Sequence, residues 1–327
     1  MKKSIIIIYG PTGIGKSEYA LALGKQFRVE LINADVGQLY TPLSLGTAKP
    51  DWKHEPMPHH LFDLIDEPVD YSVAAYRKTV LDLCQNMWER GVTPLLVGGS
   101  GFYLKSLFFP CKEGNELEQK NDDFQKELYV QDLSAEDAWH IVASYDAARA
   151  AQIHKNDLYR IHRALELIKK TGSAYDLQPT YQDLKVPVLF ICLTRDRKDL
   201  YNRINQRTQQ MIDAGWVQEV ASLQKTAWVP FLKRKKLIGY DDIMKFLEIK
   251  AATEKVPEDL INTIAQKTRN YAKRQMTFWR MLKKQLSAHF NESQHLYEFA
   301  LTYQKNSQEE LNTLVFNFLK QIPDKKG

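Results

Sequence analysis

Short apolar runs alternate along the chain with stretches of helical periodicity. Four runs predict buried strands, at Ser4–Tyr9, Glu30–Ala34, Thr93–Val97 and Val186–Leu193. Helical spacing follows the first run, over Lys16–Phe27. Strands that alternate with helices form a parallel sheet with crossover helices. The pattern therefore predicts an α/β fold.

The rest of the chain has mainly helical character. Ser72 is placed to cap a helix that runs to about Arg90, and further helices begin at Phe102 and near Lys198. Between Cys111 and Tyr181 there is only helical periodicity, and after Leu193 the chain is again nearly all helix. We therefore expect a core of residues 1–111 and about 182–285, a helical insertion over about 112–181, and a C-terminal helical tail over 286–327.

Charge is distributed unevenly. The chain has 327 residues, enough for one large or two smaller domains, and a net charge of only +5. Residues 112–137 hold nine Asp and Glu against three Lys, a net of −6, whereas residues 260–285 hold seven Lys and Arg and no acid, a net of +7. One acidic and one strongly basic segment thus lie behind a mild average.

The cysteines and the hydropathy pattern exclude several classes of protein. Cys84, Cys111 and Cys192 are scattered and form no C-x-x-C pair, which argues against a disulfide framework or a zinc site and favours a reducing cytoplasm. No apolar stretch approaches the roughly 20 residues of a membrane span. We expect a cytoplasmic protein that does not enter a membrane.

A phosphate-binding motif follows the first strand. Gly10, Gly15, Lys16 and Ser17 give the pattern G-x-x-x-x-G-K-[ST], between a predicted strand and a predicted helix. Its glycines let backbone N–H groups surround phosphate oxygens, Lys16 adds a positive charge, and Ser17 is placed to ligate Mg²⁺. The motif fits a nucleotide whose phosphorus is attacked, and equally a diphosphate ester whose carbon–oxygen bond breaks.

Two further segments follow strands at the same edge of the predicted sheet. Asp35 comes where the second strand ends, so it is a candidate general base or water-bridged Mg²⁺ ligand, and alternatively only caps the next loop. Gly98-Gly99-Ser100-Gly101 follows the third strand, where Ser100 can donate a hydrogen bond. That strand lacks the terminal acid of a Walker-B strand, which argues against an ordinary ATPase.

The basic segment reads as one helix opened by Pro257-Glu258-Asp259. Its expected core face is Leu260, Ile264, Thr268, Tyr271, Phe278 and Met281. A second basic cluster lies at residues 233–236. Together, the cations of the helix and of this cluster favour an RNA-binding surface over a charged surface that contacts only water. If a base of the bound nucleic acid is to react, that base must leave its stack. Candidates for the slot that receives the base, or for an apolar substrate pocket, are Tyr40, Phe102 and Tyr103.

Nine segments in order from about residue 4 to 285 resemble the motifs of the tRNA dimethylallyltransferases: GPTGIGKS, NADVGQLY, LGTAKP, PHHLFDL, LLVGGSGFYL, HKNDLYRIHRALELIKKTG, RINQRTQQMIDAGWVQEV, LIGYDDI and TRNYAKRQMTFWR. The resemblance implies a P-loop NTPase-like core. It also implies an enzyme that transfers the dimethylallyl group from dimethylallyl diphosphate to N6 of the adenosine adjacent to the tRNA anticodon. Diphosphate would leave with the help of Mg²⁺.

The resemblance also implies roles for individual residues. Asp35 would be the base, Ser100 would lie near the reacting centre, and Arg203 or Arg207 would reach the diphosphate, with Ser17 as the metal ligand. The diphosphate or nucleotide loop would be Gly10, Pro11, Thr12, Gly13, Ile14, Gly15, Lys16 and Ser17. Together with two cations of the basic helix, the expected tRNA contacts are Asp35, Val36, Gly37, Gln38, Ser100, Gln125, Tyr159, Arg160, Ile161, His162, Arg163, Lys273 and Arg274.

Three positions depart from the family pattern, since Val36 replaces a usual Ser, Ser100 a usual Thr and Gln125 a usual Arg. Three other functions stay open at this point: an adenylate isopentenyltransferase, a P-loop small-molecule kinase that binds ATP, and a non-catalytic RNA-binding module. For the main hypothesis we expect the tRNA anticodon stem-loop and dimethylallyl diphosphate as partners, and a monomer.

Overall fold

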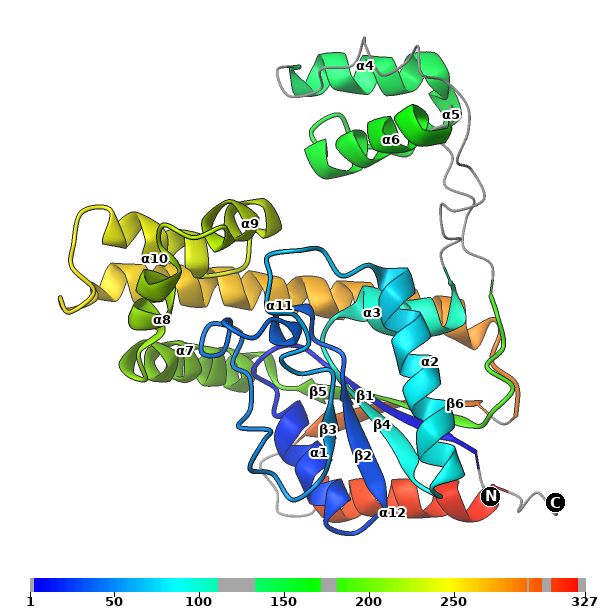
Figure 1. Cartoon of the computed structure of the whole chain (residues 1–327). Coiled ribbons are helices and arrows are strands. Elements are labelled where there is room, and N and C mark those ends of the chain that lie inside the picture. The colour runs from blue at the N-terminus through cyan, green and yellow to red at the C-terminus, as the bar shows by residue number, and fades with distance from the viewer. Residues whose placement is uncertain (1–2, 111–132, 172–180, 293, 302–306, 323–327) are drawn as a thin grey trace. The chain divides into compact units, whose positions relative to one another are not determined.

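The computed structural model describes residues 3–110, 133–171, 181–292, 294–301 and 307–322. The chain divides into two compact units, one formed by residues 1–108 and 183–327 and the other by residues 109–182. Each is described separately below, and Figure 1 shows their elements.

The first unit is built on a six-stranded sheet. Its strands are β1 (Ile5–Tyr9), β2 (Val29–Asn33), β3 (His59–His60), β4 (Thr93–Gly98), β5 (Val188–Arg195) and β6 (Gln294–Leu301). Their order across the sheet is β3-β2-β4-β1-β5-β6, and every pairing is parallel. β1 and β2 are buried along their whole length, as are parallel strands covered on both faces. The predicted α/β fold with a parallel sheet is confirmed.

Helices cover both faces of this sheet (Figure 1). One face packs against α1 (Lys16–Gly24), α7 (Arg197–Asp213) and α12 (Ser307–Gln321), whose apolar side chains share a core with alternate residues of β1, β4 and β5. Cores of this kind arise because successive side chains of a strand point to opposite faces. The opposite face carries α2 (Val73–Glu89), α3 (Gly101–Phe108) and α11 (Glu258–Ser287), where the Tyr9, Phe190 and Trp279 rings pack together.

Several helix boundaries follow from local signals in the sequence. Ser72 caps α2, and its side-chain oxygen accepts a hydrogen bond from Ala75 N, as the sequence predicts. A short helix, η1 (Val36–Leu39), follows β2 directly. After α7 come three short helices, α8 (Trp216–Leu223), α9 (Trp228–Lys235) and α10 (Tyr240–Leu247), and then the 30-residue α11.

The C-terminal segment differs from the expected all-helical tail. α12 is a helix, but β6 extends the sheet beside β5 over eight residue pairs, from Val188↔Gln294 to Arg195↔Leu301. The sequence QHLYEFAL mixes polar and apolar residues because β6 is an edge strand with several exposed side chains, and so it lacks the apolar run of a buried strand.

The second unit is described over residues 133–171 as a small helical group. It contains α4 (Ala135–Tyr145), α5 (Ala147–Ala151) and α6 (Leu158–Thr171). Their buried apolar residues form a separate core, and the indole N–H of Trp139 donates to the carbonyls of Ala150 and Ile153. Over this range the expected helical character is observed.

Candidate active site

The phosphate-binding loop connects β1 to α1 at the carboxyl edge of the sheet. The ammonium group of Lys16 donates to the carbonyls of Gly10 (3.1 Å) and Pro11 (3.3 Å) and so folds over its own loop. Gly13 has a φ of +79°, and an added Cβ would lie 2.8 Å from the Ile204 side chain. Glycine at this position therefore permits both the turn and the close packing of the loop on α7.

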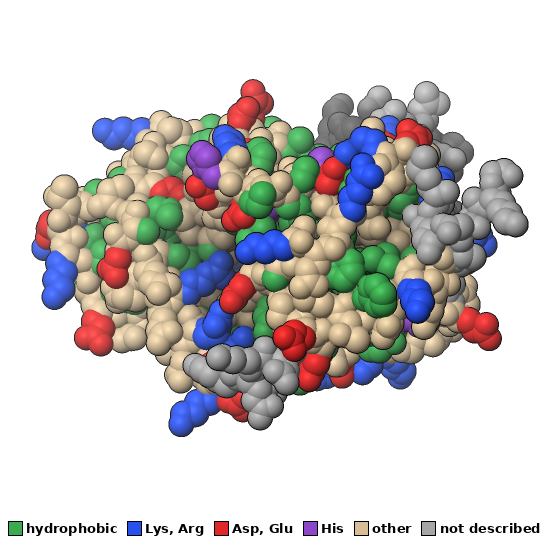
Figure 2. Space-filling view, turned by 90° about the horizontal axis from the view of Figure 1, so that it is seen from below, with side chains coloured by type: hydrophobic (Ala, Val, Ile, Leu, Met, Phe, Trp, Pro, Cys, Tyr) green, Lys and Arg blue, Asp and Glu red, His purple; other side chains and the backbone are tan. Residues whose placement is uncertain are grey.

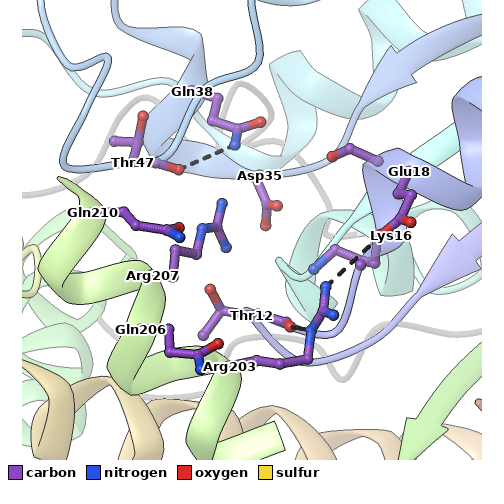
Figure 3. A pocket seen from close by; sticks show the side chains of 13 residues that line it. Thr12, Lys16, Glu18, Asp35, Gln38, Thr47, Arg203, Gln206, Arg207 and Gln210 are labelled. Carbon is purple, nitrogen blue, oxygen red and sulfur yellow. Dashed lines mark hydrogen bonds and ion pairs between the residues drawn. The ribbon is translucent and has the colours of Figure 1, made fainter. Parts of the chain in front are cut away.

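Around the loop lies a polar cavity of about 420 Å³. It is lined by Thr12, Gly13, Gly15, Lys16, Ser17, Glu18, Asp35, Gln38, Thr47, Arg203, Gln206, Arg207 and Gln210. Three cations and the N-terminus of α1 thus meet in one space (Figure 3). Such an arrangement binds phosphate groups, because the first N–H groups of a helix have no partner within it.

Asp35 lies across this cavity from the loop, directly after β2. Its Oδ1 accepts a hydrogen bond from Gly99 N at 2.6 Å, and its own N–H donates to Asn33 Oδ1 at 2.9 Å. Its carboxylate lines the cavity and is half-buried. The position predicted for the base, facing the phosphate loop, is therefore observed.

Both arginines of α7, Arg203 and Arg207, line the cavity, and which of them contacts a diphosphate stays a prediction. Four residues apart, they share one face of the helix. Arg203 donates to the Gly13 carbonyl at 3.1 Å, and Arg207 to the Ala48 carbonyl at 3.4 Å. Figure 3 shows Arg207 and Lys16 extending toward Asp35 from different sides.

Burial and charge act against each other at these cations. Burial lowers the pKa of the Lys16 ammonium, the Asp35 carboxylate raises it, and Arg207 lowers it. Burial likewise lowers the pKa of Arg207, and Asp35 raises it. Several desolvated cations close together favour an anionic ligand, because its negative charge replaces the hydration that they have lost.

A second, less polar lobe of about 370 Å³ adjoins the first and shares Thr12, Gly13, Asp35, Gln38, Thr47 and Arg207 with it. Apolar and aromatic side chains line much of this lobe, including Ile204, Met211, Trp216, Leu237, Ile238, Tyr240 and Tyr271. Asp35 therefore stands between a phosphate-binding space and a space suited to an apolar group or a flat ring.

Ser100 ties the turn after β4 to the loop after β2. Its hydroxyl accepts a hydrogen bond from Val36 N at 3.0 Å, and its own N–H donates to the Ala34 carbonyl at 3.0 Å. Ser100, Val36 and Gly37 line the second lobe. Gln38 lines both lobes, and its amide donates to the carbonyls of Thr47 and Ala48.

The remaining expected tRNA contacts are spread over both units. In the second unit, Arg160 and His162 are exposed, whereas the side chain of Ile161 is fully buried in the unit's core. Gln125 and the side chains of Tyr159 and Arg163 lie outside the described residues. In the first unit, Lys273 is exposed on α11 and Arg274 lines the second lobe. Their contact with tRNA stays a prediction.

Two expectations about aromatic and apolar residues are wrong in part: Tyr40 and Tyr103 do not line the cleft, and of the expected core face of α11 Ile264 is buried but Met281 is not. Tyr40 and Tyr103 line neither lobe; they are core residues whose hydroxyls donate to the carbonyls of Val69 and Tyr71. Phe102 is 68% exposed and packs against Phe278. On α11, the buried face consists of Ile264, Ala265, Ala272, Gln275, Trp279, Leu282 and Leu286, whereas Met281 is exposed.

Some residues at the cleft are not identified by the sequence. Lys235 and Lys236 line the second lobe, although the sequence shows them only as part of a basic cluster. Gly46 and Thr47 belong to the LGTAKP motif, to which the sequence assigns no role. They line the second lobe, and the Glu219 carboxylate holds their segment by accepting hydrogen bonds from the N–H groups of Ser44, Leu45 and Gly46. This pairing spans more than 170 residues, so no local pattern could have revealed it.

Few groups at the cleft suit a metal ion. Among the residues that the structure describes, no three His, Cys, Asp or Glu side chains gather as a metal site. The cavity nonetheless offers the Ser17 hydroxyl and the Asp35 carboxylate. Mg²⁺ is usually held by one or two protein oxygens together with substrate phosphates and waters, and this donor set fits that mode.

Comparison with known proteins decides the family. The model of the IPP transferase family matches residues 38–282, more than half of the chain. The chain belongs to the IPP transferase family. A second model, that of isopentenyl transferases, matches residues 3–55 and includes the phosphate-binding loop. The resemblance inferred from the nine motifs is confirmed, and the protein is a transferase.

Curated IPP transferases align over most of the chain. A tRNA dimethylallyltransferase of Geobacter sulfurreducens is 35% identical over 85% of this chain and 89% of its own length. Another, from Alkaliphilus metalliredigens, is 32% identical over 94% of this chain and 95% of its own.

Solved structures of the family share the fold. A full-length tRNA isopentenylpyrophosphate transferase of Bacillus halodurans has a TM-score of 0.63 and 28% identity, covering 98% of this chain and 97% of its own. A eukaryotic dimethylallyltransferase captured acting on tRNA has a TM-score of 0.78 and 26% identity, covering 99% of this chain and 81% of its own. The predicted P-loop-type core with helical additions is confirmed.

Proposed function

We propose that this IPP transferase transfers a dimethylallyl group from dimethylallyl diphosphate to N6 of the adenosine adjacent to the tRNA anticodon. One observation carries the proposal: Asp35 borders both the cationic phosphate lobe and the apolar lobe. The names of its curated relatives support tRNA as the acceptor.

In this mechanism the diphosphate of the donor occupies the polar lobe. Backbone N–H groups of Gly13–Ser17, the Lys16 ammonium and the two arginines of α7 stabilise the charge that develops as the carbon–oxygen bond breaks. The bonding electron pair leaves with diphosphate. When bound, Mg²⁺ would be held by Ser17 and phosphate oxygens and would neutralise part of that charge.

The dimethylallyl carbon then lies in the second lobe, near Asp35. The adenine N6 lone pair forms the new carbon–nitrogen bond, and Asp35 accepts the proton that N6 loses. Apolar walls such as Ile204 and Met211 exclude water, which would otherwise capture the allylic cation. The adenine must leave its stack to reach Asp35, and Arg274, Lys235 and Lys236 line the lobe that would receive it.

The alternatives differ in acceptor or in reaction. An adenylate isopentenyltransferase would use the same lobes with a free nucleotide, and a kinase would break a phosphorus–oxygen bond of ATP. Basic side chains beside the second lobe favour the polynucleotide acceptor. A non-catalytic RNA-binding module would not need the cation set facing Asp35. Because the substrate is tRNA, we place the reaction in the cytoplasm, and a monomer stays our prediction.

The test is incubation of the protein with unmodified tRNA, dimethylallyl diphosphate and Mg²⁺, followed by nucleoside mass analysis. We expect adenosine to gain one dimethylallyl group with release of diphosphate. AMP as the acceptor and ATP as the donor serve as parallel reactions. Modification of AMP in preference to tRNA, or phosphate transfer from ATP, would contradict the proposal.

A further inference from the structure

Gln275 is a buried polar residue in the middle of the basic helix α11, and the mechanism above gives it no role. The residue is 5% exposed and lies among the apolar residues of the helix's inner face. A buried carboxamide destabilises a protein unless its hydrogen bonds are satisfied. Its partners therefore indicate why it is there.

Both ends of the carboxamide are paired, each with a different loop of the active site. Its Oε1 accepts from Thr12 N in the phosphate-binding loop at 2.9 Å, and its Nε2 donates to the Gly99 carbonyl at 2.9 Å. The partners fix the orientation of the amide, because a backbone N–H only donates and a carbonyl only accepts. The two loops follow adjacent strands, β1 and β4.

The second loop continues the connection to the base. Gly99 N donates to Asp35 Oδ1 at 2.6 Å. A Cβ added at Gly99 would lie 2.2 Å from Nε2 of Gln275, so only glycine allows the carboxamide to approach this closely. Three hydrogen bonds thus run in sequence from Thr12 through Gln275 and Gly99 to Asp35.

We propose that Gln275 is a positioning residue that sets the separation between the phosphate-binding loop and the Asp35 carboxylate. The proposal rests on the proposed function, in which leaving group and base must lie a fixed distance apart. A misplacement of about 1 Å at such a site costs about 100-fold in rate. Gln275 also lines the second lobe, but in this proposal it acts through main-chain groups, and the catalytic contacts belong to Asp35 and the loop.

Gln275→Met removes both hydrogen-bonding groups and keeps the length of the side chain. We expect kcat for tRNA prenylation to fall at least tenfold, whereas the KM for dimethylallyl diphosphate changes less than threefold because Lys16 and the arginines remain. Tyr9→Phe is the matched control, since the buried Tyr9 hydroxyl donates to the backbone carbonyl of Gln275 at 2.7 Å and not to its carboxamide. The control should retain kcat within twofold.

Gln275→Glu gives a readout that a purely structural role would not produce. A protonated glutamic acid can accept from Thr12 N and donate to the Gly99 carbonyl, as glutamine does, whereas the carboxylate repels that carbonyl. Burial raises the pKa of such an acid. We expect the ratio of kcat of Gln275→Glu to kcat of the wild-type protein to rise as the pH falls from 8 to 5.5. The same ratio for Gln275→Met should stay constant.

Hydrogen exchange tests the bridge without any assay of activity. In Gln275→Met, the backbone amides of peptides that contain Thr12 should exchange faster than in the wild-type protein, because Thr12 N loses its acceptor. Peptides that contain Gly99 should also exchange faster, although Asp35, the acceptor of Gly99 N, is still present. The proposal would be overturned if the Gly99 amide were as well protected in Gln275→Met as in Tyr9→Phe. It would also be overturned if Gln275→Met had an unchanged kcat, or if the relative kcat of Gln275→Glu did not depend on pH. If the unmodified protein transfers no prenyl group, the proposed function fails, and the exchange result still decides whether the bridge exists.

Discussion

At the cleft, burial and a neighbouring carboxylate have opposite effects on the pKa values of single cations. The Asp35 carboxylate raises the pKa of Lys16 and of Arg207, against the effect of burial on both. One acid thus helps to keep two desolvated cations protonated in the protein without ligand. A bound diphosphate would add its negative charge to this effect.

We expect Lys16→Ala to weaken binding of the donor by about 10- to 100-fold, because a charge-assisted contact to phosphate contributes about 1.5–3 kcal/mol. Calorimetric titration with a non-reactive thio analogue of dimethylallyl diphosphate measures this. Lys25→Ala, exposed beyond the end of α1, is the control and should bind as the unmodified protein does. Equal affinities of the two variants would show that Lys16 does not contact the diphosphate.

Asp35→Asn keeps the shape of the side chain and removes its charge and basicity. General-base catalysis contributes about 10²–10⁴-fold, and we expect kcat to fall by about 100-fold. Binding of tRNA should change less than threefold. Single-turnover rates and filter binding separate the two effects. Unchanged turnover would mean that another group accepts the N6 proton.

The sequence identified those side chains that belong to local motifs. Lys16 and Asp35 each follow an apolar run that is easily recognised in the sequence. For the arginine that contacts the diphosphate, the sequence reduced the candidates to Arg203 and Arg207 of α7. Gln275 was missed because its role depends on packing α11 against loops more than 170 residues away. Tyr40 and Tyr103 were misassigned because an aromatic residue near a motif serves the core as readily as a ligand.

Helices and strands were predictable where their apolar pattern was complete. The four central strands have buried runs, and α2 has its serine cap. The two edge strands were missed: β3 contains only two residues, and β6 exposes part of its side chains. Edge strands are half solvated, so their sequences resemble loops.

The edge formed by β2 and β3 contains a buried carboxylate, paired with two partly exposed basic side chains, that gives a pH-dependent prediction. The Glu30 carboxylate accepts from both terminal nitrogens of Arg90, at 2.6 and 2.8 Å, and contacts His60 Nε2 at 2.8 Å. Hydrogen bonds from Arg90 and His60 lower the pKa of Glu30 from 4.5, against the effect of burial. The stabilisation is therefore present above pH 4.5 and is lost as the pH falls through the lowered value.

We expect Glu30→Gln to lower the free energy of unfolding by about 1–2 kcal/mol at pH 7, since Arg90 stays partly solvated. Urea unfolding at pH 7 and at pH 3.5 measures the difference between the two proteins. It should shrink at the lower pH, because pH 3.5 lies below the ordinary pKa of 4.5 and therefore closer to the lowered pKa of Glu30 in the folded protein. A difference that grows toward low pH would contradict the assigned pKa direction.

Taken as a whole, the chain has a mild net charge of +5, so its affinity for RNA must come from local charge. On the face drawn in Figure 2, acidic and basic side chains are intermixed. No helix within the described ranges is both long enough and apolar enough to cross a membrane. The contribution of α11 to tRNA binding can be tested by comparing substitutions of its basic residues with a substitution of a basic residue elsewhere on the surface.

We expect the double variant Lys273→Ala, Arg274→Ala to weaken tRNA binding and to reduce the slope of log K against log salt by about 1 to 2, since each substitution removes one cation that can pair with a phosphate. Filter binding between 50 and 200 mM salt measures this slope. Lys320→Ala, exposed on α12, is the control and should leave the slope unchanged. A slope in the double variant equal to that of the wild-type protein would exclude these two side chains from the tRNA interface.

In the proposed mechanism Asp35 faces the carbon from which diphosphate departs. A crystal structure of the protein with the non-reactive thio analogue of dimethylallyl diphosphate tests it directly. We expect the diphosphate at Lys16 and the two arginines of α7, and the dimethylallyl group in the adjoining lobe with its reactive carbon turned toward Asp35. A dimethylallyl group that points away from Asp35, beyond the reach of any base, would show that Asp35 is not placed to accept the N6 proton.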